Sequence, residues 1–317
     1  MDHRNQRFVV LNILLLSIVV IYGVDEHFTY SYTEVSEEPQ YGVQWIKSDD
    51  PGMRPNISQR FDGTVDKLPV TYVDINSHGF RDEEYSQEKP EDVYRIGIVG
   101  DSYAFGWGVN RSNRFSEVLQ RELESEKKEI QVLNFGVPDS TTNEQVDGFE
   151  ERWQSFELDH VVLAYTYNSI MDREEVDRIE KEIQEGNETY LEQGNESYNV
   201  YWAMFPEKDF SKQRENLEQP LSRLHKLSNE NEFGVTIYHF TQYFGQAQPE
   251  KQDKLLLEIK EDYNWTYIDS DPLYDKYSHN ELHLTSIDPH PTELYHEEVG
   301  KQIYHNINWR KCLSRGC

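Results

Sequence analysis

The stretch Tyr94-Arg95-Ile96-Gly97-Ile98-Val99-Gly100-Asp101-Ser102 decides the fold that this sequence predicts. Its first six residues are mostly apolar and β-branched, which indicates a short buried strand. Residues 104–109 are small and rich in glycine, and a helical pattern follows over residues 112–127. Ser102 is therefore expected where a strand ends and the chain turns toward a helix, which is the crevice where open α/β sheets bind ligands.

A serine at such a turn has two interpretations. Its hydroxyl is exposed, and nearby backbone N–H groups can face a developing oxyanion, as a nucleophile requires. Glycine, aspartate and serine are also common turn residues, so Gly100-Asp101-Ser102 is equally typical of an ordinary turn.

Strand and helix patterns alternate from residue 92 onward. We expect strands at residues 94–99, 130–135, 160–167, 234–240 and 266–269, and helices at 112–127, 142–156, 215–231, 255–263 and 293–308. This alternation predicts an α/β domain over residues 91–317, in which helices cover both faces of a parallel sheet of about five strands. An insertion at residues 172–214 is charged in its first half and aromatic in its second. It is either a lid or substrate wall over the crevice or a peripheral subdomain.

The N-terminal part of the chain has a different character. Residues 8–24 are almost wholly apolar after a mildly basic start, and they are long enough to approach the lower limit for a spanning helix. We expect residues 1–24 to be a signal anchor, with a cleaved signal peptide as the alternative. Basic residues precede the apolar segment and acidic residues follow it, so the bulk of the chain is expected outside the cytoplasm. Residues 25–90 form a polar extension with a short edge strand near residues 70–73.

The charge and the cysteine content exclude some classes of binding partner and of metal site. The formal net charge of -28 argues against nucleic acid and anionic lipid headgroups, whose phosphates would be repelled. The two cysteines, Cys312 and Cys317, cannot form a metal site alone; they are either one terminal disulfide in an oxidising compartment or two thiols. Five Asn-x-Ser/Thr triplets agree weakly with export, at Asn56, Asn110, Asn187, Asn195 and Asn264.

Two further polar or small residues end neighbouring strands. Gly136 follows the second expected strand, and Asn168 follows the third. A glycine lets its backbone N–H approach a ligand closely, and an asparagine amide is a neutral donor suited to an oxyanion. Because parallel strands end at one edge of a sheet, both residues are expected near Ser102.

A histidine base is expected in the loop before the last helix. In an extended loop, residues two apart point to the same side. The Asp288 carboxylate can then bind one nitrogen of His290 while the other nitrogen faces Ser102 and takes its proton. Other histidines that could serve as the base are His239, His279, His283 and His296, of which His296 is expected to be structural on the closing helix.

Four segments together resemble the SGNH (GDSL-type) hydrolase superfamily. They are Gly100-Asp101-Ser102, Asn134-Phe135-Gly136-Val137-Pro138, Tyr165-Thr166-Tyr167-Asn168 and Asp288-Pro289-His290-Pro291, which occur in the order of the family's blocks. The upstream Asn76-Ser77-His78-Gly79-Phe80-Arg81-Asp82 resembles a segment of a membrane-anchored or exported branch. Two features depart from the usual pattern: Ser169 stands where aspartate commonly follows the asparagine, and one residue rather than two separates Asp288 from His290.

The resemblance implies a flavodoxin-like three-layer α/β/α sandwich and ester chemistry through an acyl-serine. It implies that Ser102 is the nucleophile and an oxyanion donor, that Gly136 and Asn168 complete the oxyanion hole, and that Asp288 orients the base His290. It implies no metal and no organic cofactor. The expected activity is an esterase that removes O-acyl groups from an extracytoplasmic glycan or another small ester. The alternatives are an O-acyltransferase to a surface polysaccharide and a catalytically silent glycan-binding or assembly protein.

Overall fold

The computed structural model describes residues 31–34, 53, 55–62, 71–124, 126, 129–166, 211–241, 249–285 and 288–315. The expected signal anchor at residues 1–24, the insertion up to residue 210, and Asn168 with its neighbour Ser169 lie outside these ranges. None of the helices built from the described residues is both long and apolar enough to span a membrane.

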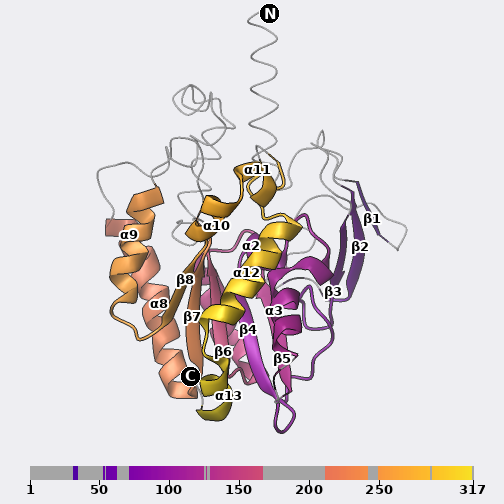
Figure 1. Ribbon diagram of the computed structural model, residues 1–317. Helices are drawn as coiled ribbons and strands as arrows, with labels where there is room; N and C mark the ends of the chain where they lie inside the picture. Colours follow the sequence, from indigo (N-terminus) through magenta and orange to yellow (C-terminus); the bar gives the residue numbers. More distant parts are fainter. Residues whose placement is uncertain are drawn as a thin grey trace, which may run out of the picture.

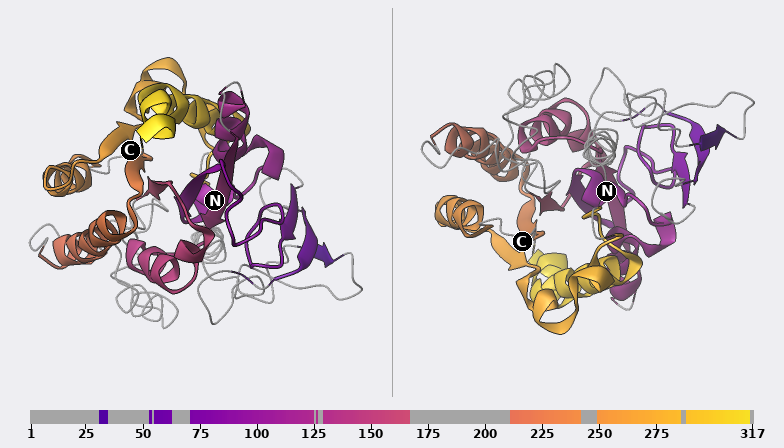
Figure 2. Two further views of the ribbon diagram at one scale, coloured as in Figure 1. Left: turned by 90° about the horizontal axis from the view of Figure 1, so that it is seen from below. Right: turned by 90° about the horizontal axis from the view of Figure 1, so that it is seen from above.

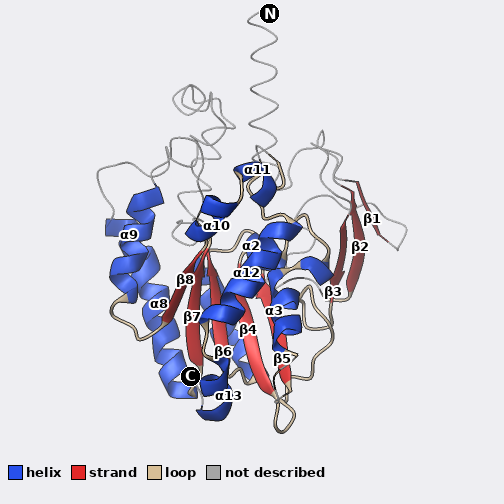
Figure 3. Ribbon diagram, in the orientation of Figure 1, coloured by secondary structure: helices blue, strands red, loops and turns tan. Residues whose placement is uncertain are grey.

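A five-stranded parallel sheet forms the centre of the molecule (Figures 1 and 3). Its strands are β4 (Tyr94–Gly100), β5 (Ile130–Gly136), β6 (His160–Tyr165), β7 (Gly234–His239) and β8 (Thr266–Asp269). The spatial order is β5-β4-β6-β7-β8, and every neighbouring pair is parallel. This is the 2-1-3-4-5 order of flavodoxin-like sheets, in which ligands bind beyond the carboxyl end of the first strand. The predicted parallel sheet is confirmed.

Helices cover both faces of the sheet, as Figure 2 shows. One face carries α3 (Phe115–Leu123) and α12 (Glu293–Asn306), and the other carries α4 (Thr142–Glu151), α8 (Ser211–Asn231) and α9 (Pro249–Lys260). The strands are buried throughout, apart from parts of β5 and β8, because helices pack on both sides of them. The three layers predicted from the alternating pattern are therefore present.

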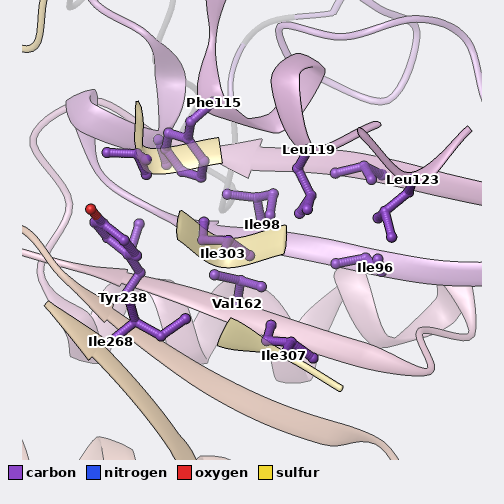
Figure 4. Packing of buried hydrophobic residues seen from close by; sticks show 14 of the residues in the cluster. Ile96, Ile98, Phe115, Leu119, Leu123, Val162, Tyr238, Ile268, Ile303 and Ile307 are labelled. Carbon is purple, nitrogen blue, oxygen red and sulfur yellow. The ribbon is translucent and has the colours of Figure 1, made fainter. Parts of the chain in front are cut away.

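Each face has its own hydrophobic cluster. Figure 4 shows the cluster in which Ile96 and Ile98 of β4 pack with Phe115 and Leu119 of α3 and with Ile303 of α12. The opposite cluster joins residues of β5 and β6 to the apolar sides of α4, α8 and α9. Full burial of each such aliphatic or aromatic side chain contributes about 1.5–3 kcal/mol, so the two clusters fix the helices to the sheet.

Shorter elements connect these layers. They are α2 (Ser102–Phe105), α10 (Asp271–Lys276), α11 (His279–Leu282), α13 (Trp309–Arg315) and the 3-10 turns η2 (Arg111–Asn113) and η3 (Trp153–Phe156). The helix predicted over residues 142–156 is interrupted, because Arg152 adopts a non-helical φ of -138° between α4 and η3. The helix predicted over residues 255–263 starts earlier, at Pro249.

A second sheet precedes the main domain in the sequence. It is antiparallel, with the order β1 (Ser31–Glu34), β2 (Ile57–Asp62) and β3 (Thr71–Ile75). It lies on the β5 side of the main sheet (Figures 1 and 2). The edge strand predicted near residues 70–73 corresponds to β3, whereas β1 and β2 were not predicted.

Candidate active site

Ser102 lies on a sharp turn at the carboxyl end of β4. A Cβ added to Gly100 would lie 2.8 Å from the Cβ of Ala164 and 2.9 Å from that of Ala104, so a glycine lets the chain turn this closely against β6. The next residue, Asp101, caps α2 by accepting from the Tyr103 N–H at 2.9 Å. Its other oxygen accepts from the Thr166 hydroxyl at 2.6 Å. Asp101 therefore ties the start of α2 to the end of β6.

The structure brings the three predicted catalytic side chains into one hydrogen-bonded chain. Nε2 of His290 lies 2.9 Å from Oγ of Ser102, and Nδ1 of His290 lies 2.6 Å from Oδ1 of Asp288. All three residues are buried, with 7–8% of each exposed. With the Nδ1 proton donated to the carboxylate, Nε2 is the acceptor that faces the serine hydroxyl.

The short spacing between Asp288 and His290 is accommodated by the loop geometry. Oδ1 of Asp288 accepts from both the backbone N–H and the ring of His290, at 2.9 and 2.6 Å. The carbonyl of the intervening Pro289 accepts from the Tyr103 hydroxyl at 2.8 Å and lies 2.5 Å from Nδ1 of His283. One residue between aspartate and histidine is therefore sufficient here.

The electrostatics of the loop suit these roles. Burial on its own raises the pKa of Asp288, but the nearby His290 and its hydrogen bonds outweigh this and lower the pKa below its ordinary value. The carboxylate is therefore ionised at neutral pH and can stabilise an imidazolium. Burial, and then the neighbouring His279, lower the pKa of His283 to about 4, so His283 is neutral and can donate its Nδ1 proton to Pro289.

The other candidate bases have different partners. At the end of β7, Nδ1 of His239 lies 2.9 Å from the Tyr267 hydroxyl, and burial lowers the pKa of His239 to about 4. His296 accepts from the Phe115 N–H at 3.3 Å within the core, which agrees with its predicted structural role. His279 stacks on His283 with ring centroids 4.1 Å apart. Among the residues that the structure describes, the histidine bonded to Ser102 is His290.

Gly136 has a different role from the predicted one. Its N–H donates to Oδ1 of Asn134 at 2.9 Å, so this amide already has an acceptor within the protein, and the structure does not support its assignment to an oxyanion hole. A Cβ at this position would lie 2.3 Å from the backbone nitrogen of Phe105 and 2.6 Å from the carbonyl carbon of Ala104. Glycine is therefore required because α2 packs directly against the end of β5.

The other two predicted oxyanion donors are Ser102, which the structure describes, and Asn168, which it does not. Ser102 is the first residue of α2, a position whose N–H has no acceptor inside its own helix. Asn168 lies outside the described residues. Sequence reasoning missed Tyr103, which directly follows the serine but binds Pro289, 186 positions away. No local pattern links residues so distant.

No protein-family model and no curated protein matches the chain. Among solved structures, the chain is similar to a lipolytic protein of the G-D-S-L family from Desulfitobacterium hafniense, with 13% identity and a TM-score of 0.47 over 67% of this chain and 99% of that chain. It is similar to a lipase/acylhydrolase from Enterococcus faecalis, with 19% identity and a TM-score of 0.45 over 71% and 97% of the two chains. It is also similar to an acetyl xylan esterase, with 11% identity and a TM-score of 0.47 over 67% and 99%.

Proposed function

We propose that this protein is a serine-dependent ester hydrolase that works through an acyl-serine intermediate. The observation that carries the proposal is the unbroken hydrogen-bonded chain from Ser102 through His290 to Asp288 at the carboxyl edge of the sheet. A nucleophile, a base and a group that orients the base are the parts that nucleophilic acyl transfer requires.

Each proposed step follows from these contacts. Oγ of Ser102 attacks the ester carbonyl while Nε2 of His290 takes the hydroxyl proton, and the Asp288 carboxylate stabilises the resulting imidazolium. The tetrahedral intermediate collapses as His290 returns that proton to the leaving alcohol, which leaves an acyl-Ser102 ester. A water molecule that gives a proton to His290 then attacks the acyl carbonyl. His290 returns this proton to Oγ of Ser102 as the acyl C–O bond breaks, which releases the acid and regenerates the serine.

Donors to the oxyanion are part of the same proposal. The backbone N–H of Ser102 is available to a substrate oxygen because it starts α2. The Asn168 amide is the second donor that the motif resemblance suggests. Each donor is worth roughly 10²–10³ in kcat in comparable sites.

The proposed substrate is an O-acyl ester on an extracytoplasmic glycan. The upstream segment from Asn76 to Asp82 supports this through its resemblance to exported relatives, and the apolar residues 8–24 support anchoring in a membrane. Cys312 is disulfide-bonded, and Cys317 is the other cysteine in the chain. Disulfides persist mainly in oxidising compartments, so this bond supports an extracytoplasmic domain.

The function is tested with the full chain in mild detergent and p-nitrophenyl acetate as substrate. We expect Ser102→Ala to lower kcat by about 10⁴-fold or more. Ser228→Ala is the matched control, because Ser228 is equally buried but binds the His225 carbonyl on α8, and it should retain wild-type activity. Equal hydrolysis by wild type and Ser102→Ala would exclude the serine mechanism and favour a glycan-binding protein.

Two further measurements address the acceptor and the location. Adding a soluble oligosaccharide to the active enzyme distinguishes hydrolysis from transfer, because an acyltransferase would place the acyl group on the sugar. Carbonate extraction of membranes tests the anchor. An anchored protein stays in the pellet, whereas a secreted one is released.

A further inference from the structure

The Asn76–Asp82 segment forms a compact turn beside the active site. The Asn76 side chain accepts from the backbone N–H groups of His78 and Phe80, both at 3.0 Å. Gly79 adopts a φ of +83°, and a Cβ there would lie 2.4 Å from the Met53 carbonyl oxygen, so only glycine fits. Phe80 packs edge-to-face on Phe135 of β5, with ring centroids 4.7 Å apart. The turn is therefore rigidly attached to the main sheet.

Arg81 extends from this turn to the back of α2. Its side chain is 1% exposed, and its guanidinium donates to four backbone carbonyls at 2.7–3.2 Å, those of Tyr72, Phe105, Gly106 and Val109. Phe105 is the last residue of α2 and Gly106 is its C-cap, with a φ of +78°. Burial, and then the nearby Arg114, lower the pKa of Arg81 to about 9, so it stays charged at neutral pH.

Asp82 reaches the same end of α2 indirectly, through Asn134 of β5. The Asp82 carboxylate accepts from the backbone N–H of Asn134 at 2.7 Å. The Asn134 side chain in turn donates to the Ala104 carbonyl at 2.8 Å and to the Ser116 hydroxyl at 3.0 Å. Arg114, also fully buried, donates to the carbonyl of Arg81 and pairs with Asp82. The last two carbonyls of α2 are therefore held by Arg81 of the turn directly and by Asn134 of β5, whose backbone N–H donates to Asp82.

We propose that Arg81 is a positioning residue that holds α2 by its C-terminal end and thereby keeps Oγ of Ser102 within hydrogen-bond distance of His290. This rests on the proposed function, in which Ser102 is the nucleophile. α2 is only four residues long, so a shift at its C-cap Gly106 is transmitted directly to Ser102. Ser102 and Gly106 belong to one hydrogen-bonded turn, since the Gly106 N–H donates to the Ser102 carbonyl at 3.1 Å.

The expected effect is on reactivity rather than on substrate binding. A displacement of the nucleophile by about 1 Å can cost roughly 100-fold in rate. Arg81 lies behind α2 and is 1% exposed, so its replacement changes the position of the serine while leaving the binding surface in place. A kcat that falls with an unchanged KM is the signature of this role.

Arg95 is a matched control at the other end of the sheet. It is also fully buried, and its guanidinium donates to three backbone carbonyls at 2.8–2.9 Å, those of Ser86, Gln87 and Phe156. It lies near the start of β4, so the same substitution removes a similar set of bonds far from Ser102. Arg81→Lys, Arg81→Met and Arg95→Lys are prepared in the full chain.

Three quantities are measured for each variant: kcat and KM with p-nitrophenyl acetate, the rate at which a fluorophosphonate labels Ser102, and the midpoint of thermal unfolding. We expect Arg81→Lys to lower kcat and the labelling rate by about 10-fold and Arg81→Met by about 100-fold, with KM within about 3-fold of wild type. Arg95→Lys should lower the unfolding midpoint comparably and leave kcat unchanged.

Several outcomes would overturn the proposal. Wild-type kcat and labelling in both Arg81 variants would show that α2 keeps its position without the guanidinium. Equal losses of kcat in Arg81→Lys and Arg95→Lys, or failure of both Arg81 variants to fold, would assign Arg81 to stability alone. Failure of the proposed function itself is seen separately, as undiminished hydrolysis by Ser102→Ala in the wild-type Arg81 background.

Discussion

Charged side chains are buried at both ends of the parallel strands, the amino edge and the carboxyl edge of the sheet, but the hydrogen bonds that they make there differ. At the amino edge, Arg95 donates to backbone carbonyls, and Nε2 of His160 lies 2.9 Å from the Thr236 hydroxyl. At the carboxyl edge, Ser102, His290 and Asp288 bind one another in sequence (Figure 1 places this edge at the α2 end of β4). The amino edge thus uses its polar groups to fix backbone, and the carboxyl edge uses them to connect a hydroxyl to a carboxylate.

The contrast shows that burial of a histidine does not by itself indicate catalysis. Burial lowers the pKa of His160 to about 4, and Nε2 of His160 contacts a neutral hydroxyl, that of Thr236. His290 is as buried but has an ionised carboxylate on one nitrogen and a serine on the other. The useful criterion is the pair of groups on the two ring nitrogens, because a base needs an orienting acceptor as well as a proton donor.

The largest difference in kcat is expected between variants of the two histidines, His290 at the carboxyl edge and His160 at the amino edge. We expect His290→Gln to lower kcat for p-nitrophenyl acetate by about 10⁴-fold or more, because His290 is the base hydrogen-bonded to the Ser102 hydroxyl among the residues that the structure describes. His160→Gln should leave kcat within about 2-fold of wild type, since it changes a core contact to Thr236. Equal activities of the two variants would remove the distinction between the edges.

The next largest difference in kcat is expected between variants of Asp288 at the carboxyl edge and Asp159 at the amino edge. Asp288→Asn should lower kcat by about 10²–10⁴-fold, because an amide cannot stabilise the imidazolium and turns the ring toward the wrong tautomer. Asp159 at the amino edge accepts from the Arg95 N–H at 2.8 Å and pairs with Lys89, so Asp159→Asn should keep full activity. The measurement is kcat across pH 6 to 9, and an unaffected Asp288→Asn enzyme would contradict the proposed role.

Most of the main domain was predictable because its strands are short runs of apolar, β-branched residues. Residues 160–165 are an example: all six are buried, and the strand starts where predicted. Strands β1 and β2 could not be predicted, because their sequences show no clear alternation and the strands depend on pairing within the small sheet, β1 with β2 and β2 with β3. The break at Arg152 depends on backbone geometry that helix periodicity does not reveal.

The sequence predicted the site residues that lie at the ends of strands and helices. It did not predict roles that depend on the conformation of a single neighbouring side chain. The juxtaposition of Ser102 with Asp288 and His290 follows from strand order and from the loop before α12. The role assigned to Gly136 did not follow, because the Asn134 side chain folds back onto its N–H two residues later. Spacing alone does not show that contact.

His160, at the amino edge, should make the unfolding free energy depend on pH. Its folded pKa of about 4 is below the ordinary 6.5, so as the pH falls from 6.5 to 4 the unfolded chain binds a proton that the folded chain does not. The unfolding free energy therefore declines over this window by roughly 2–3 kcal/mol through His160. His160→Gln removes this contribution. We expect its urea-unfolding free energy to approach that of wild type as the pH falls, and parallel curves would contradict the assignment.

The smallest effect is expected for the tyrosine that supports the catalytic loop. Tyr103→Phe removes one of two donors to the Pro289 carbonyl, and His283 remains to hold the loop. A lost neutral hydrogen bond is worth about 1 kcal/mol, so kcat should fall by about 3- to 10-fold with KM unchanged. Tyr94→Phe is the control, since Tyr94 is equally buried at the amino edge and should lose stability at most. A wild-type kcat in Tyr103→Phe would show that the loop does not need this hydroxyl, and that His283 alone fixes Pro289 and therefore His290.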